Sequence, residues 1–185
     1  DDAIATAVVQ LRQDPAVDRI VICSPDKDLT QMVEADRTVC FDRRRGVVLD
    51  QQGVIEKFGV SPESIPDFLA LTGDTADGIP GLPRWGAKTS AQVLARYLHI
   101  EDIPADPQEW EVDVRGALSL GKILVEYIEE VRLYKDLATL RTEVPLDASL
   151  ASLEWRGVIK EDYRALCEEL GFNRLTELPH RWASV

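Results

Sequence analysis

The sequence predicts an α/β fold up to about residue 60 and an all-helical lobe after it. Two short runs, Ile20–Cys23 and Thr38–Phe41, have the apolar and β-branched character of strands. A short helix separates them, which gives the strand–helix–strand order of a βαβ-like unit. From residue 50 onward the apolar residues recur at helical spacing, and residues that start and stop helices punctuate the chain.

The α/β part begins with a helix over residues 2–12. Its apolar side chains between Ile4 and Leu11 recur at helical spacing, and Asp14-Pro15 ends the pattern. A domain that starts inside a helix is unusual, so we expect the chain to be a fragment of a longer protein. The elements that follow are strand 20–23, a short helix ending near residue 33, strand 38–41, a basic turn at 43–46 and strand 47–49.

The helical part has clear start and stop signals. Asp50 can cap a helix that runs to Phe58 and stops at Gly59. Ser61 followed by Pro62 is an N-cap and first-turn pair that opens a helix to about residue 71. Further helices are predicted around residues 88–97, 112–118, 122–137 and 161–170, with a proline-containing linker at 103–107.

The composition is that of a globular protein from a reducing compartment. Hydrophobic residues make up 45% of the chain, too many for a disordered protein. No apolar run approaches the ~20 residues of a membrane-spanning helix, and the acidic N-terminus lacks the basic flank of a signal peptide. The cysteines show no metal-ligand spacing, so we expect a cytoplasmic protein in which they are small core residues: Cys23, Cys40 and Cys167.

The net charge of the chain is −12, from 33 acidic and 21 basic residues. A chain this acidic should repel a polyanion, which argues against nucleic acid as a partner. Six of the acids, however, are candidate metal ligands, and bound metal would neutralise them. Metal binding would explain about half of the imbalance.

The candidate ligands form three aspartate pairs, each where a predicted element begins or ends. In open α/β sheets, ligands bind beyond the carboxyl ends of the strands, where the second pair must lie. Carboxylates packed together repel one another unless cations neutralise them, and Mg²⁺ is a hard ion that takes oxygen ligands. The pairs are Asp1 and Asp2, Asp26 and Asp28, and Asp74 and Asp77.

Each pair also has an ordinary structural explanation. Asp1 and Asp2 could be first-turn carboxylates favoured by the dipole of the helix that follows. Asp26 or Asp28 could cap the short helix after the first strand. The third pair could consist of turn residues between glycines. No pair alone decides between the two explanations.

A glycine-punctuated turn follows the third pair and opens the helix predicted at 88–97. Glycine lets a backbone approach a phosphate closely, and the amides at a helix N-terminus attract anions. The spacing is not that of a P-loop, because Ala87 separates Gly86 from Lys88. The alternative is a tight helix–helix turn without a ligand. A metal site beside a phosphate-binding turn indicates an enzyme or binder of nucleic acid.

The order of these motifs carries more information than any one of them. They are Asp-Asp-Ala at 1–3, Ser-Pro-Asp-Lys-Asp-Leu at 24–29, Leu-Thr-Gly-Asp-x-x-Asp-Gly-x-Pro-Gly at 71–81 and Gly-Ala-Lys-Thr at 86–89. This order resembles the 5′–3′ exonuclease and flap endonuclease family, which includes the N-terminal nuclease domain of bacterial DNA polymerase I. The likeness continues through residues 137–142 and 169–172, so it covers nearly the whole chain.

The resemblance implies a PIN-like α/β core, here partial, over residues 1–60. It implies a helical lobe over 61–185 with a helix-hairpin-helix-type motif at about 79–97, whose final helix packs back on the core. It also implies that two Mg²⁺ or Mn²⁺ ions hydrolyse DNA near a 5′ end, a flap or a nick. The catalytic residues would be Asp26, Asp28, Asp74 and Asp77, and Asp1 and Asp2 would complete the metal site.

In the same family, the hairpin grips the DNA backbone and holds a K⁺ ion on main-chain carbonyls. The resemblance also implies a monomer with a functional link to a DNA polymerase. The residues that would contact DNA are Gly81, Arg84, Trp85, Gly86, Ala87, Lys88 and Thr89.

The chain departs from the family pattern in ways that leave a second function open. Gly78 stands where the family usually has Asn, and Arg84 replaces the first glycine of a Gly-hydrophobic-Gly turn. The signature glutamate expected two positions before Asp1 is absent, as are the first strand with its aspartate and the arch that holds the 5′ end. A non-catalytic DNA-binding fragment is therefore the main alternative to an active nuclease.

A third function is an aspartate-nucleophile phosphatase. Residues 26–30, Asp-Lys-Asp-Leu-Thr, fit the DxDxT pattern of haloacid dehalogenases, and Gly73-Asp74 could be the distal acidic motif. Against this, Asp74 follows an amphipathic helix, whereas the dehalogenase motif usually abuts a strand.

A few residues outside the acid pairs have two interpretations. The arginines at 43–45 could touch DNA or simply be exposed in a hairpin connection. Trp85 could wedge against a base or anchor the hairpin in the core. His99 and His180 lie outside every motif, so we expect surface or packing roles for them.

Overall fold

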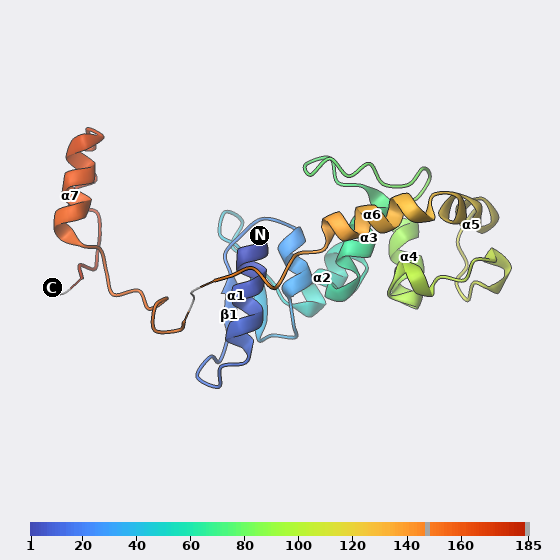
Figure 1. Ribbon diagram of the computed structural model, residues 1–185, viewed down its shortest axis with the longest axis horizontal. Helices are drawn as coiled ribbons and strands as arrows, with labels where there is room; N and C mark the ends of the chain where they lie inside the picture. The colour runs from blue at the N-terminus through green and yellow to red at the C-terminus, as the bar shows by residue number, and fades with distance from the viewer. Residues whose placement is uncertain (147–148, 184–185) are drawn as a thin grey trace. The chain divides into compact units, whose positions relative to one another are not determined.

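The computed structural model describes residues 1–146 and 149–183 (Figure 1). By its internal contacts the chain divides into two compact units, Asp1–Leu146 and Asp147–Val185. The first unit contains both the sheet and most of the helices. The domain boundary predicted at residue 60 stays a prediction.

A three-stranded sheet forms the front of the first unit, in the order β1-β2-β3. β1 (Ile20–Ile22) pairs in parallel with β2 (Thr38–Asp42), with Ile22 opposite Cys40, and β2 pairs antiparallel with β3 (Val47–Leu49). The connection from β1 to β2 contains the 3₁₀ helix η1 (Asp28–Met32). The predicted strand–helix–strand unit is confirmed. The loop that leaves the carboxyl end of β1 contains Asp26, and Asp28 begins η1.

Two helices flank the sheet. α1 (Asp2–Arg12) buries Ala5 and Val8 and packs against β1 and η1. α2 (Gln51–Phe58) begins at Asp50, whose carboxylate accepts a hydrogen bond from the Gly53 amide at 2.8 Å. It ends at Gly59, which takes a left-handed conformation. Both helices agree with the prediction, because capping residues and apolar spacing point to the same boundaries.

The helical part of the first unit is built around α3 (Ile65–Thr72), which follows the 3₁₀ turn η2 (Pro62–Ser64). Every residue of α3 from Ile65 to Leu71 is buried. α3 packs along α6 (Ile128–Ala138) and against α4 (Ala87–Tyr97), as Figure 1 shows. The remaining elements are η3 (Ile100–Asp102), η4 (Pro107–Glu109) and α5 (Ala117–Glu126).

The helices predicted at 112–118 and 122–137 are wrong in their bounds. Residues 110–116 form no helix, and α5 begins only after Gly116, whose φ is +82°. Val114 is buried although the segment around it is irregular. Its apolar side chain, with those nearby, repeats at helical spacing, which explains the wrong prediction. Tyr127, at φ −108° and ψ 25°, then separates α5 from α6.

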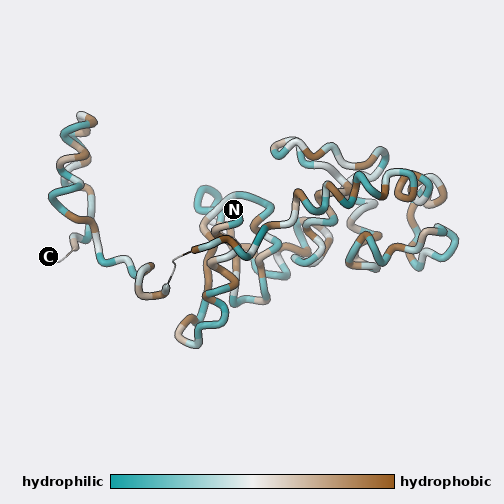
Figure 2. Tube along the Cα trace, in the orientation of Figure 1, coloured by the Kyte–Doolittle hydropathy of each residue, from teal (hydrophilic) through white to brown (hydrophobic). Residues whose placement is uncertain are grey.

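One core of buried residues joins the sheet to the helices of the first unit. Figure 2 shows hydrophobic and hydrophilic stretches alternating along the helices, as expected where one face of each is buried. Cys40 and Cys167 are buried as predicted, but Cys23 is exposed. The core prediction is therefore wrong for Cys23, which directly follows the last residue of β1.

A network of charged side chains ties α3, α6 and the loop before η3 together. Asp67, fully buried in α3, accepts hydrogen bonds from the Ile100 amide at 2.9 Å and from Lys135 of α6 at 2.8 Å. His99 lies 3.1 Å from the same carboxylate, and Lys135 also contacts Glu101 at 2.6 Å. His99 therefore has the packing role expected of it.

The second unit contains α7 (Lys160–Glu169), which confirms the predicted final helix. Its side chain Tyr163 meets Trp182 edge to face, with 5.9 Å between ring centroids, and a β-bridge joins Val158 to Trp182. None of the helices in the described parts of either unit is long and apolar enough to cross a membrane.

Candidate metal centre and DNA-binding turn

Three of the six predicted ligands meet in the first unit. Asp28, Asp74 and Asp77 each offer a carboxylate oxygen, and these oxygens lie within 4.8 Å of one another. Asp28 is the first residue of η1, which follows the loop that leaves the carboxyl end of β1. Asp74 and Asp77 belong to the turn that follows α3, where the backbones of Asp74 and Ile79 pair as a β-bridge. Two segments far apart in sequence therefore bring the carboxylates together.

Asp28 is in the least favourable electrostatic environment of the three. Its side chain is buried, and its Oδ1 atom has no hydrogen-bond partner among the described residues. Burial and a hydrogen bond shared with Asp77 raise the pKa of Asp28 to about 7, although Lys27 partly offsets this. An uncompensated buried carboxylate oxygen beside two other carboxylates is the environment that a cation would relieve.

Asp74 is better compensated than Asp28. Its Oδ1 atom accepts a hydrogen bond from the Ala76 amide at 3.1 Å, and its Oδ2 atom contacts the ammonium group of Lys27. Burial opposes ionisation of Asp74, but the contact with Lys27 and the Ala76 amide outweigh it, so its pKa lies below the ordinary value. Asp74 is thus ionised at neutral pH and available to a cation.

The first aspartate pair borders the same site without joining the cluster. Asp1 and Asp2 line a cavity of about 530 Å³ together with Asp28 and Asp77. The Asp2 carboxylate accepts a hydrogen bond from the Arg141 amide at 3.0 Å, and neither residue caps α1 through its side chain. The apolar wall of this cavity comes from the end of α6 and the residues after it: Leu137, Ala138, Leu140 and Val144.

Asp26 lies outside the three-carboxylate cluster. Its Oδ1 atom accepts a hydrogen bond from the Asp28 amide at 3.1 Å, as in an Asx turn. Asp26 does not cap η1, whose N-cap residue is Lys27. It lines a separate cavity of about 450 Å³ with Lys27 and Lys57. Asp26 therefore shapes the loop that presents Asp28, and its own role as a metal ligand stays a prediction.

The glycine-rich turn lies against the end of α3. Gly81 has a φ of +71°, and a Cβ atom on it would meet the backbone nitrogen of Gly73 and lie 2.6 Å from the carbonyl carbon of Thr72. The Leu82 amide donates to the Leu71 carbonyl at 2.8 Å, which fixes the turn to the helix. The turn that leads into α4 and the turn that carries Asp74 are therefore joined by main-chain contacts.

Replacing Gly81 by alanine is expected to destabilise the protein by about 2–3 kcal/mol, because the Cβ meets immovable backbone at a left-handed φ. Gly78 is the matched control: its φ is +74°, but a Cβ there would meet nothing within 4 Å. Gly78→Ala should cost about 1 kcal/mol from backbone strain alone. Urea unfolding of both variants measures the difference, and equal losses would show that the contact with Gly73 is unimportant.

The exposed side of the turn has the features of an anion site. No side chain caps α4, so the amides of its first turn are available to a ligand. Gly86, Ala87 and Lys88 are exposed, and Thr89 is half-buried. These four predicted contacts lie where a phosphate could reach them.

Arg84 and Trp85 brace the turn against α5. Arg84, at φ +69°, donates to the hydroxyl of Ser119 at 2.7 Å. Trp85 is buried, its indole N–H donates to the Leu120 carbonyl at 3.3 Å, and its ring lies 6.0 Å from that of Trp110. The Trp85 side chain is therefore a hydrophobic anchor, and only its backbone remains as a possible DNA contact.

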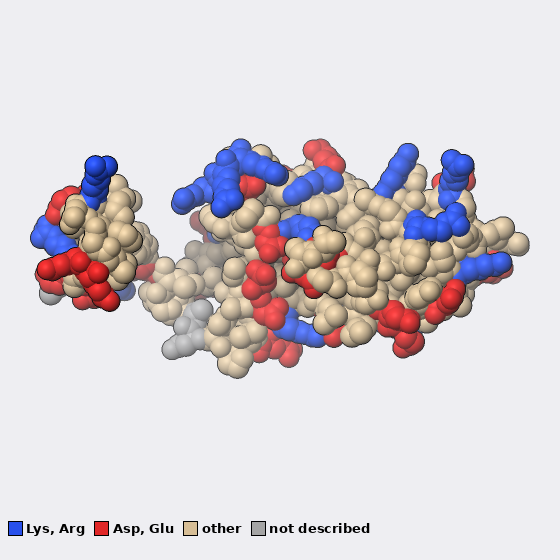
Figure 3. Space-filling view, turned by 90° about the horizontal axis from the view of Figure 1, so that it is seen from above, with Lys and Arg blue, Asp and Glu red and all other residues tan. Residues whose placement is uncertain are grey.

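The distribution of charge bears on whether so acidic a chain can meet DNA. Figure 3 shows acidic side chains gathered in a band on one face of the first unit, with basic side chains grouped beside them. The arginines at 43–45 are exposed in the β2–β3 turn. Because basic side chains also gather in groups on this face, the net charge does not describe the local field that a ligand meets.

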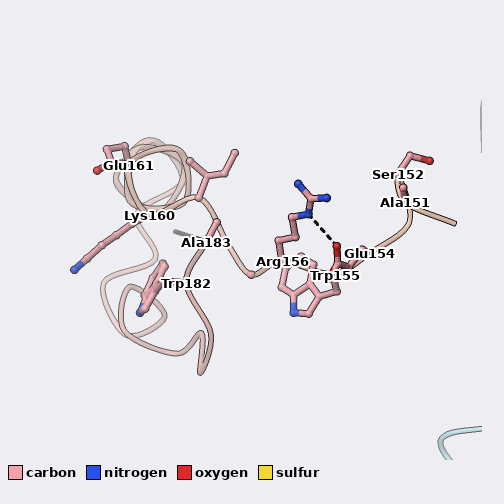
Figure 4. A pocket seen from close by; sticks show the side chains of 11 residues that line it. Ala151, Ser152, Glu154, Trp155, Arg156, Lys160, Glu161, Trp182 and Ala183 are labelled. Atoms are coloured by element: carbon pink, nitrogen blue, oxygen red, sulfur yellow. Dashed lines mark hydrogen bonds and ion pairs between the residues drawn. The ribbon is translucent and has the colours of Figure 1, made fainter. Parts of the chain in front are cut away.

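A further cavity, of about 710 Å³, lies within the second unit. Figure 4 shows Trp155 and Trp182 at this cavity, with the ion pair of Arg156 and Glu154 beside Trp155. The residues that line it bring no cluster of carboxylates, thiols or imidazoles together. We assign no chemistry to it.

Sequence reasoning missed Lys27 as a member of the site. Its ammonium group contacts Asp74 and lies 4.0 Å from Asp28. The sequence feature that could have pointed to Lys27 is its position between two candidate ligands, Asp26 and Asp28. Sequence reasoning also missed the apolar side of the cavity at the end of α6. The family likeness of residues 137–142 was the sequence feature that could have pointed to it.

Comparison with known proteins identifies the family. Residues 60–161 match the family model described as "5′-3′ exonuclease, C-terminal SAM fold". The chain belongs to the 5′–3′ exonuclease family. Members of this family similar to the chain include DNA polymerase I of Bacillus subtilis, 33% identical over 96% of this chain and 20% of the relative. The 5′-3′ exonuclease of Aquifex aeolicus is 31% identical over 87% of this chain and 57% of the relative.

The fold comparison agrees with the sequence comparison. The bacteriophage T5 flap endonuclease in a pseudo-enzyme–product complex with DNA and metal ions shares the fold, with a TM-score of 0.63 and 20% identity over 76% of this chain and 49% of the other. The α/β core followed by a helical lobe is thus confirmed as the fold class of a 5′–3′ exonuclease. The chain spans about a fifth of the DNA polymerase I relatives and about half of the stand-alone exonucleases.

Proposed function

We propose that this chain is the metal- and DNA-binding part of a structure-specific 5′ nuclease that hydrolyses DNA phosphodiesters with divalent metal ions. The observation that carries the proposal is the meeting of the Asp28, Asp74 and Asp77 carboxylates, together with a buried Asp28 Oδ1 atom to which no described residue donates a hydrogen bond. Membership of the 5′–3′ exonuclease family supports the nuclease proposal and disfavours the alternative of a dehalogenase-type phosphatase.

Mg²⁺, or Mn²⁺ in its place, is the ion we propose for this site, because hard divalent ions prefer carboxylate oxygens. Asp28, Asp74 and Asp77 would hold it, and Asp1 and Asp2, on the same cavity, would complete a two-ion site in the intact protein. A bound ion would activate a water molecule and stabilise the leaving oxygen. The carboxylates would hold and orient the ion.

The turn at 81–89 would hold the DNA backbone while the carboxylates act on it. Its uncapped amides and Lys88 suit a phosphate, and a K⁺ ion at the hairpin would add positive charge. The partner we propose is DNA with a 5′ end, a flap or a nick, and we propose no membrane partner. A cytoplasmic monomer linked to a DNA polymerase completes the proposal, in line with the DNA polymerase I relatives.

The test is cleavage of a DNA duplex with a fluorescent 5′ flap by the 185-residue chain, with Mg²⁺ or Mn²⁺ and with EDTA. We expect shortened products only with the metal ion. The double variant Asp26→Asn/Asp28→Asn, purified in parallel, controls for contaminating nucleases. If the wild-type chain binds the flap and never cuts it, the chain is a DNA-binding fragment and the catalytic proposal fails for it.

A further inference from the structure

Lys27 is the one basic side chain that the described residues place against the three-carboxylate cluster. Its Nζ atom contacts Asp74 Oδ2 and lies 4.0 Å from Asp28 Oδ1, so the ammonium group lies beside two of the three carboxylates. The Asp74 side chain is 4% exposed and that of Lys27 is 34% exposed. The Lys27 ammonium group therefore supplies one positive charge to a site that contains three carboxylates.

This ammonium group cannot satisfy the cluster by itself. Three carboxylate oxygens lie within 4.8 Å of one another, and Asp28 Oδ1 still has no hydrogen-bond donor in the part of the chain that the structure describes. A divalent ion would supply the missing charge, but it would then lie within a few ångströms of the Lys27 ammonium. Like charges at such separations repel strongly in a partly buried site.

Room exists for Lys27 to move away. The cavity of about 450 Å³ that Lys27 borders is also lined by Asp26 and by Lys57. The Asp26 carboxylate already acts on the Lys27 charge and offers it a second partner. A lysine head group on a flexible four-carbon stem can exchange one carboxylate for another at little cost. Asp26, outside the cluster, would receive the ammonium group that Asp74 releases.

We propose that Lys27 is a displaceable counterion: it neutralises Asp74 in the metal-free protein and competes with the divalent ion for the cluster. This inference rests on the proposed function only in taking the cluster as a divalent-metal site. Lys27 would thus control the affinity of the cluster for the metal ion and would take part in no chemical step.

Lys27→Met, which keeps the stem and removes the charge, tests the proposal through Mn²⁺ binding followed by electron paramagnetic resonance at constant ionic strength. The dissociation constant for Mn²⁺ should fall at least about five-fold, because the competing charge is gone. The matched control is Lys57→Met, which lines the same cavity but makes no ion pair with a described carboxylate. Its dissociation constant should change less than about two-fold.

A second measurement uses the wild-type chain and does not depend on the folding of a variant. Acylation of lysines by acetic anhydride, read by mass spectrometry, should increase at Lys27 at least about two-fold when Mn²⁺ is added, because the amine exchanges the buried Asp74 carboxylate for the more accessible carboxylate of Asp26. Lys57 serves as the internal reference. Protection of Lys27 that is unchanged or increased by Mn²⁺ overturns the proposal.

The outcomes separate the inference from the proposed function. Equal or weaker Mn²⁺ binding by Lys27→Met overturns the inference alone. Failure of the wild-type chain and the variant to bind Mn²⁺ overturns the metal site and the inference together. Tighter binding by Lys27→Met in a chain that never cuts flap DNA supports the inference and removes the nuclease proposal.

Discussion

Asp28→Asn is expected to lower metal-dependent cleavage of a 5′ flap by at least about 100-fold, since a metal ion contributes several kcal/mol of transition-state stabilisation and each 1.4 kcal/mol is a factor of ten. Asp28 stands out among the six aspartates because it is buried in the cluster and has an oxygen to which none of the residues in 1–146 and 149–183 donates. An amide in its place removes one negative charge and weakens the hold on a cation. Single-turnover cleavage at saturating Mg²⁺ measures the loss.

The control for Asp28→Asn is a substitution of the same type away from the cluster. Asp36 is exposed, so Asp36→Asn should cleave at the wild-type rate. The melting temperature of Asp28→Asn in EDTA should be no lower than that of the wild type, because the amide relieves repulsion between neighbouring carboxylates. Cleavage by Asp28→Asn within ten-fold of the wild-type rate would remove Asp28 from the metal site.

Asp67→Ala should cost about 3 kcal/mol in the free energy of unfolding, the largest effect on stability that we expect from a single side chain. The substitution leaves the Ile100 amide without its acceptor and deprives Lys135 of its most buried partner. Breaking a buried ion pair by removing one partner costs about 3–5 kcal/mol. Lys135 is 22% exposed and can turn to water, which places the expected loss at the lower end. Urea unfolding monitored by circular dichroism gives the value.

Glu101→Gln tests the exposed end of the same network. Glu101 is 45% exposed, so its ion pair with Lys135 should contribute no more than about 1 kcal/mol. Burial opposes ionisation of Glu101, but the hydrogen bond from Lys135 outweighs it and holds the pKa below its ordinary value. A lowered carboxyl pKa stabilises the fold above pH 4.5 and ceases to do so as the pH falls through the lowered pKa. The stabilities of Glu101→Gln and the wild type should therefore converge in acid. A loss for Glu101→Gln as large as that for Asp67→Ala would mean that burial does not set the strength of the network.

The fold could be predicted where local signals agreed with one another. The cap at Asp50 and the stop at Gly59 bound α2 closely, and the apolar run at 20–23 locates β1. The same reasoning failed at 112–118, because buried residues in an irregular segment repeat with helical spacing by chance. Gly116 is the residue that ends the irregular segment, and its left-handed φ becomes evident only with the backbone in place.

The candidate site was predicted in kind but not in detail. Motif order identified all six aspartates, and the structure brings three of them together. Sequence could not separate Asp26 from Asp28, since the two are equally acidic and two positions apart. The difference lies in a hydrogen bond: Asp26 accepts from the Asp28 amide, which directs one carboxylate to the loop and leaves the other to the cluster. Lys27 escaped prediction because its contact with Asp74 spans 47 positions of the chain.

The main-chain contact between Gly73 and Gly81 has a consequence for the register of cleavage. One glycine leads into the Asp74 carboxylate and the other into the turn proposed to hold DNA, and no side chain separates them. Under the proposed function, these main-chain contacts would help to set the spacing between the held nucleotide and the reacting one. Under the same proposal, inserting or deleting residues between 73 and 81 would change that spacing directly.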